Sequence, residues 1–112
     1  MPKKILIPLY KDSLAPRFDL ATEVLIGLVG ESHNVEEKRV VVLPEASPEE
    51  VCNLIFTEGI DVVICCAIEK EYYDYLVWKK IQVFDSVVGS VDRVLRAFEK
   101  GELSSGDIIM DY

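Results

Sequence analysis

An uninterrupted apolar segment near the start of the chain constrains the fold most strongly. Residues 5–9 read Ile-Leu-Ile-Pro-Leu, with no polar side chain among them. A strand with one face in water alternates apolar and polar residues, whereas a continuous apolar run predicts a strand covered on both faces. A sheet with helices packed on its two sides provides that cover. Residues 3–9 are therefore predicted to form a central, buried strand.

Two further apolar runs predict a β-hairpin. Residues 23–29 and 38–43 are rich in valine, leucine and isoleucine, and the stretch between them, residues 30–37, is polar. Two strand-like runs joined by a short polar segment are typical of antiparallel neighbours, and this connection is longer than a tight turn. We expect the hairpin to lie beside the first strand.

The second half of the chain alternates helices and strands. A helix is predicted to start at Ser47, whose hydroxyl can serve as the N-cap. Pro48 then stands at the first helical position, and Glu50 lies three places after the cap. Gly59 is placed to end this helix. Further elements are a strand over 61–66, a helix over 69–80, a strand over 81–84 and a helix from Ser90 to Gly101.

This order predicts a three-layer α/β fold. Strand–helix–strand connections require right-handed crossovers and parallel pairing, so the sheet should be mixed and five-stranded. The first strand is expected at the centre, the hairpin on one side and the two later strands on the other, with three main helices on the two faces. Residues 1–112 are expected to form one domain, because 112 residues bury a single core. Residues 102–112 are predicted to be an edge strand or a docking segment.

Charge and cysteine content exclude several functions. Twenty acidic residues oppose 12 basic ones, for a net charge of −8, which does not suit binding to nucleic acid or an anionic membrane. No apolar run approaches the roughly 20 residues that span a bilayer, so a cytoplasmic location is expected. Three cysteines, two of them adjacent, do not form a disulfide framework, and their chemistry is expected to be that of thiols.

The first strand carries no carboxylate, which argues against two-metal nuclease chemistry.

Three motifs resemble a known family. They are Ala-Pro-Arg-Phe-Asp-Leu-Ala at 15–21, Glu-Gly-Ile-Asp-Val-Val-Ile-Cys at 58–65 and Val-Gly-Ser-Val-Asp-Arg-Val-Leu at 88–95. In this order they resemble the dinitrogenase iron-molybdenum cofactor biosynthesis family, the NifX type that also forms the C-terminal part of NifB proteins. The resemblance implies a ribonuclease-H-like fold. It also implies a non-enzymatic protein that binds or carries an iron-sulfur or iron-molybdenum precursor cluster and meets a cluster-assembly partner.

The resemblance also implies a site at the loop over residues 13–19 and at Cys66. Ser13, Arg17, Phe18 and Ala67 are the predicted ligand-binding residues, and Cys66 is the predicted metal ligand. No catalytic residue is predicted.

Two departures from the family motifs favour a second hypothesis. Arg17 stands where the family usually has histidine, and a guanidinium offers donors but does not coordinate metal. Ala67 and Glu69 lie where the family has a glycine-rich turn, and carboxylates in a first helical turn repel anions. The alternative is a protein-interaction or regulatory module that kept the fold and lost the cluster site.

Other candidate residues have simpler interpretations. Cys65 and Cys66 are expected to be neighbours on a strand, so their side chains should point to opposite faces and not readily chelate one ion. Cys66 lies nearer the carboxyl end of that strand and is the functional candidate. The alternative is that Cys66 packs as a small buried hydrophobic residue. Cys52 is expected to pack, and His33 to be a solvated loop residue. The aromatic residues between Tyr72 and Trp78 are expected to form a half-buried face or a partner surface.

Overall fold

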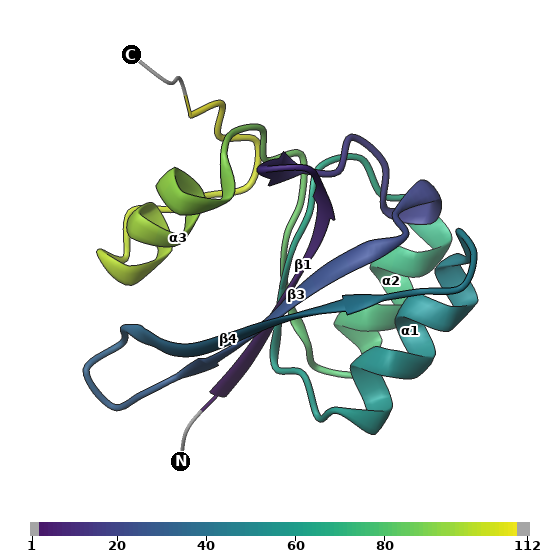
Figure 1. Ribbon diagram of the computed structural model, residues 1–112, viewed down its shortest axis with the longest axis horizontal. Coiled ribbons are helices and arrows are strands. Elements are labelled where there is room, and N and C mark those ends of the chain that lie inside the picture. The colour runs from purple at the N-terminus through teal and green to yellow at the C-terminus, as the bar shows by residue number, and fades with distance from the viewer. Residues whose placement is uncertain (1–2, 110–112) are drawn as a thin grey trace.

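The computed structural model describes residues 3–109 and has the predicted three-layer α/β architecture (Figure 1). Five strands follow the order β4-β3-β1-β5-β6, and a sixth, two-residue strand, β2, pairs with β1. Their bounds are β1 Lys3–Tyr10, β2 Ser13–Leu14, β3 Glu23–Val29, β4 Val35–Val42, β5 Val62–Ile64 and β6 Gln82–Phe84. The predicted strand order and the central position of the first strand are confirmed.

Strand β1 joins the two halves of the sheet. It pairs antiparallel with β3, where Ile7 faces Leu25, and parallel with β5, where Leu6 faces Val63. Ile5, Leu6 and Ile7 are each 0% exposed. The side chains of Ile5 and Ile7 enter the core on one face of the sheet, and that of Leu6 enters the core on the other. The continuous apolar run thus follows from burial on both faces.

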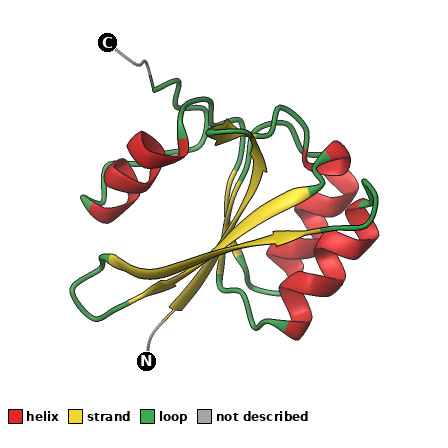
Figure 2. Cartoon of the chain, viewed as in Figure 1, coloured by secondary structure: helices red, strands yellow, loops and turns green. Residues whose placement is uncertain are grey.

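The three helices divide between the two faces, as Figure 2 shows. Helices α1 (Pro48–Thr57) and α2 (Lys70–Trp78) cover one face, and α3 (Val91–Glu99) lies against the other. The predicted caps are present, since Ser47 and Ser90 each accept a hydrogen bond from the backbone three residues later and Gly59 adopts a positive φ. No helix within residues 3–109 is long and apolar enough to cross a membrane.

The hairpin turn is tied to the last turn of α3. Strand β4 begins at Val35, three residues earlier than predicted, so the turn is shorter. The His33 ring stacks on Phe98 with centroids 4.8 Å apart, and its Nε2 lies 3.1 Å from the Phe98 carbonyl oxygen. The Val35 backbone N–H donates to Glu99. His33 is exposed, as predicted, but it also holds the hairpin against α3.

Three short segments complete the fold. Strand β2 and the short 3₁₀ helix η1 (Phe18–Leu20) lie within the loop after β1, and neither was predicted. The segment after α3 docks on the loop that follows β6, because Ile108 forms a parallel bridge with Val88 and the Ile109 N–H donates to the Val88 carbonyl. Of the two alternatives for residues 102–112, an edge strand or a docking segment, the contacts up to residue 109 are those of a docked segment, and residues 110–112 lie outside the described part.

The N-cap of α1 gives a direct stability test. Replacing Ser47 by alanine removes the oxygen that accepts a hydrogen bond from the Glu50 N–H, which should lower the free energy of unfolding by about 1 kcal/mol. Chemical denaturation followed by circular dichroism measures this change. Ser32→Ala, in the exposed hairpin turn, is the control and should leave stability unchanged. Equal stability of Ser47→Ala and the parent would contradict the assigned cap.

Candidate functional site

Three loops meet where the parallel strands end. Residues 11–22 follow β1, residues 65–69 follow β5 and residues 85–90 follow β6. Because β1, β5 and β6 run parallel, their carboxyl ends lie at one edge of the sheet. Ligands of open α/β sheets collect at this position. We call these three loops the carboxyl edge.

Backbone hydrogen bonds hold the three loops in register. The Ala67 N–H donates to the Pro16 carbonyl at 3.0 Å, and the Phe18 N–H donates to the Ala67 carbonyl at 2.8 Å. On the other side, the Ser86 N–H donates to the Cys66 carbonyl at 2.7 Å. The segment containing Cys66 therefore lies between its two neighbouring loops and is fixed by both.

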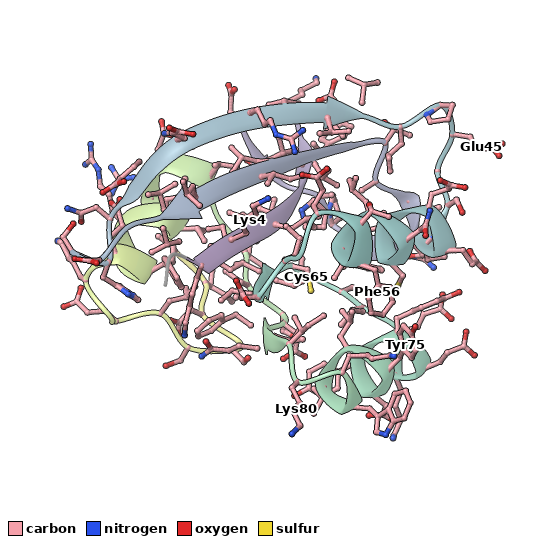
Figure 3. The ribbon with its side chains drawn as sticks, turned by 90° about the horizontal axis from the view of Figure 1, so that it is seen from below. Lys4, Glu45, Phe56, Cys65, Tyr75 and Lys80 are labelled. Carbon is pink, nitrogen blue, oxygen red and sulfur yellow. The ribbon has the colours of Figure 1, made fainter. Side chains whose placement is uncertain are left out.

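The two adjacent cysteines have different environments. Cys65 is 1% exposed and packs in the core beneath α1 and α2, whereas Cys66 is partly exposed. Figure 3 places the Cys65 sulfur in the interior, between the sheet and these helices. Burial, with a contribution from Asp85, raises the pKa of the Cys65 thiol to about 12. Cys52 on α1 is also buried, and burial followed by the charge of Glu49 raises its pKa to about 11. Cys66 is thus the accessible thiol of the three.

Arg17 is paired within its own loop. Its Nε and Nη2 atoms donate to the two carboxylate oxygens of Asp19, at 3.0 and 2.6 Å. This two-pronged geometry is the usual way in which a guanidinium recognises a carboxylate or phosphate. Asp19 therefore occupies the Nε–Nη2 side of the guanidinium, which is two of its five N–H donors.

The other three predicted ligand-binding residues, Phe18, Ala67 and Ser13, lie in different environments. Phe18 is 1% exposed and its ring packs against Tyr72, so this side chain belongs to the core. Ala67 is exposed and forms a bridge with Arg17. Ser13 is exposed but bridges Ser90, at the start of α3. The structure thus brings Arg17, Phe18 and Ala67 together beside Cys66 and connects Ser13 to a different loop.

Asp85 and Ser86 also belong to the edge, and the sequence analysis missed them. The Asp85 backbone N–H donates a hydrogen bond to the Ser105 hydroxyl oxygen of the docked tail, at 3.1 Å. Ser86 has a φ of 58°, a left-handed conformation that is uncommon for residues other than glycine and often occurs at functional sites. Both residues directly follow β6, and that position at the end of a parallel strand was the signal that could have identified them.

Two hollows flank the carboxyl edge. One, of about 670 Å³, lies between the sheet and α3 and is lined by charged groups that include Lys11, Asp12 and Arg96. The other, of about 330 Å³, lies beside Pro16, Arg17 and Leu20. Neither is lined by Cys66. Cys66 is partly exposed beside these hollows without lining either of them.

The described residues do not include a complete metal-binding set. Within residues 3–109, no group of three or more histidine, cysteine, aspartate or glutamate side chains is arranged to hold a metal ion. A single thiolate can supply one ligand to iron, and further ligands would have to come from the bound species itself or from another molecule.

Several solved structures share this fold. The crystal structure of PH0822 has a TM-score of 0.81 at 22% sequence identity and covers 91% of this chain and 93% of its own. MJ0327 from Methanocaldococcus jannaschii, provisionally named a dinitrogenase, has a TM-score of 0.76 at 25% identity, covering 93% of this chain and 94% of its own. TM1290 from Thermotoga, provisionally named a NifB protein, has a TM-score of 0.68 at 21% identity, covering 98% and 99%.

These neighbours define the class of protein at the level of the fold. No protein-family model matches the sequence, and no curated protein matches it. The similarity to MJ0327 and TM1290 extends over nearly the whole of each chain and shows that these proteins share the fold. The predicted ribonuclease-H-like α/β class is confirmed.

The difference between the three thiols predicts selective alkylation. At pH 8 a thiol with a pKa of about 11 is only about one part in a thousand thiolate, and the thiolate is the reactive form. Iodoacetamide should therefore modify Cys66 well before Cys52 and Cys65, as peptide mass spectrometry would measure. Cys66→Ala should abolish the fast reaction, and Cys52→Ala, the matched control, should retain it. Modification of Cys65 as fast as that of Cys66 would contradict this assignment.

Proposed function

We propose that this protein is a non-enzymatic binding or carrier protein for an iron-sulfur or other metal-cluster precursor, in cofactor assembly related to that of nitrogenase. The observation that carries the proposal is the accessible Cys66 thiol at the carboxyl edge of the sheet. The fold similarity to proteins provisionally named dinitrogenase and NifB supports it.

Cys66 would act as a ligand that receives and releases its cargo. Thiolate is the usual ligand of iron-sulfur clusters, and one thiolate from the protein leaves the other iron positions free. Free positions suit a carrier, because a recipient protein can add its own ligands before Cys66 dissociates. The backbone bonds on both sides of Cys66 would keep the thiol in place during this exchange.

The charges around Cys66 define the cargo that the edge would accept. Arg17 is neutralised by Asp19, and Glu69 lies exposed at the start of α2. Asp85 lies close enough to contribute to the raised pKa of Cys65. These carboxylates disfavour a highly anionic ligand and favour iron sites that carry positive charge. Recognition would therefore be through iron rather than through the sulfide surface of the cluster.

Cys66 is proposed to bind its cargo without a catalytic step. His33, the only histidine of the chain, lies on the hairpin turn against the last turn of α3, whereas the carboxyl edge adjoins the first turn of that helix. Cys66 therefore has no imidazole base beside it, and such a base is one of the usual ways in which a catalytic cysteine is activated.

The second candidate function is an interaction or regulatory module without a cluster site. The Arg17–Asp19 pair favours it, since the guanidinium at the position of the family histidine does not coordinate metal and is paired with a carboxylate of its own loop. The two candidates differ in a single property, which is whether the isolated protein binds iron through Cys66.

Anaerobic reconstitution with ferrous iron and sulfide tests the proposal. The parent protein should retain iron after gel filtration and show thiolate-to-iron charge-transfer absorption in the visible range, because Cys66 is accessible. Cys66→Ala should lose both signals, whereas the matched variant Cys52→Ala should keep them, since Cys52 is buried on α1. Absence of bound iron in the parent, or equal binding by Cys66→Ala, would contradict the carrier function and favour the second candidate.

A further inference from the structure

A groove between α1 and α2 lies outside the carboxyl edge. Its volume is about 490 Å³, and its lining combines carboxylates and aromatic rings from the two helices. The residues that line it include Glu49, Cys52, Phe56, Glu71, Tyr72 and Tyr75. In Figure 3 the Phe56 and Tyr75 side chains extend toward one another between the two helices. We call this feature the α1–α2 groove.

One end of the groove is an exposed aromatic surface. Phe56 and Tyr75 are 42% and 37% exposed, and Trp78, the only tryptophan of the chain, is 72% exposed. The rings are contiguous, with centroids 5.7 Å apart for Phe56 and Tyr75 and 6.3 Å apart for Tyr75 and Trp78. Single exposed apolar residues are normal, but a contiguous aromatic surface marks an interaction site.

The other end of the groove is acidic. The Tyr72 hydroxyl donates to Glu49 at 3.2 Å, and Glu71 lines the groove beside it. Desolvation, followed by the charges of Glu49, Glu71 and Glu69, raises the pKa of Tyr72 to about 12. Among the described residues that line the groove, none is a lysine or an arginine. The groove therefore favours a cationic occupant.

The aromatic surface already holds a cation from the protein itself. The Lys79 ammonium lies 5.2 Å from the Phe56 ring centroid and 4.9 Å from that of Trp78. Cations over aromatic faces are attracted by the negative charge of the ring face. Lys79 therefore occupies the cation position over these two rings, and a cation from a partner would bind at the acidic end of the groove instead.

We propose that the α1–α2 groove docks a basic, amphipathic helical segment of a partner protein. Apolar side chains of that segment would pack on Phe56, Tyr75 and Trp78, and an arginine would lie between Glu49 and Glu71. A helix laid into a groove is a common mode of peptide recognition. A guanidinium suits this lining because it stacks on aromatic rings and forms paired hydrogen bonds with carboxylates.

The charge of the whole protein favours the same partner. A net charge of −8 attracts a basic segment over a distance and repels the phosphates of nucleic acids and membranes. The groove contains none of the residues assigned to cargo binding, because Cys66 is absent from its lining. This inference is therefore independent of the proposed carrier function, and either can fail without the other.

The single tryptophan provides the test. A helical peptide of leucine, alanine and arginine is titrated into the protein while the emission of Trp78 is recorded. Binding should shift the emission to shorter wavelengths and reach saturation, because the peptide removes Trp78 from water. A peptide of equal length with glutamate in place of arginine should leave the emission unchanged.

Matched variants separate the groove from general attraction by the acidic surface. The double variant Glu49→Gln/Glu71→Gln should raise the dissociation constant of the peptide at least fivefold. The control double variant Glu36→Gln/Glu37→Gln, at exposed positions on β4, should change the dissociation constant less than twofold. Phe56→Leu and Phe56→Ala should weaken binding progressively, and Val42→Ala, at a 69% exposed position, should not.

Several results would overturn the proposal. Equal weakening by the two glutamate pairs, or equal binding of the glutamate peptide, would show non-specific attraction. An unchanged Trp78 emission would place the peptide elsewhere. A concentration-dependent shift of that emission in the protein alone, together with dimer formation in sedimentation velocity, would assign the groove to a second copy of this chain instead.

Discussion

The burial of β1 on both faces and along both edges is the constraint on which the rest of the structure depends. Antiparallel pairing with β3 and parallel pairing with β5 use the two edges of the strand, and the helices on the two faces exclude water from Ile5, Leu6 and Ile7. Because β5 and β6 run parallel to β1, the loops after all three strands are brought to one edge. The candidate site is thus a consequence of how the central strand is buried.

The loop directly after β5 then determines which thiol is available at that edge, because Cys65 and Cys66 both follow the last strand residue, Ile64, and do not lie on the predicted strand over 61–66. Cys65 continues the buried pattern of β5 into the core under α1 and α2, so the next residue, Cys66, is left partly exposed between the loops after β1 and β6. The two thiols therefore differ in access, with Cys65 buried and Cys66 partly exposed. The proposed carrier function rests on this single accessible thiol, which would supply one ligand to iron and leave the other positions to the cargo or its recipient.

Much of the fold could be predicted because its signals are local. The Ser47 and Ser90 caps, the apolar run in β1 and the alternation of strands and helices all act through neighbouring residues, and each is confirmed. The site was harder to predict because it depends on distant backbone bonds. Strand β2, the pairing of Ala67 with the loop after β1 and the placement of Asp85 by the tail arise only when separate segments meet. The Arg17–Asp19 pair is close in sequence, but its geometry depends on the turn that the folded loop imposes.

Paramagnetic line broadening tests the central claim most directly, because it locates bound iron without removing any residue. Amide spectra of the ¹⁵N-labelled protein are recorded during anaerobic addition of ferrous iron and sulfide. Iron held by Cys66 should selectively broaden the amide signals of the loops that border it, residues 17–18, 65–67 and 85–87. Broadening centred on another part of the chain, such as the α1–α2 groove, or spread evenly over the spectrum, would contradict a cargo site at the carboxyl edge.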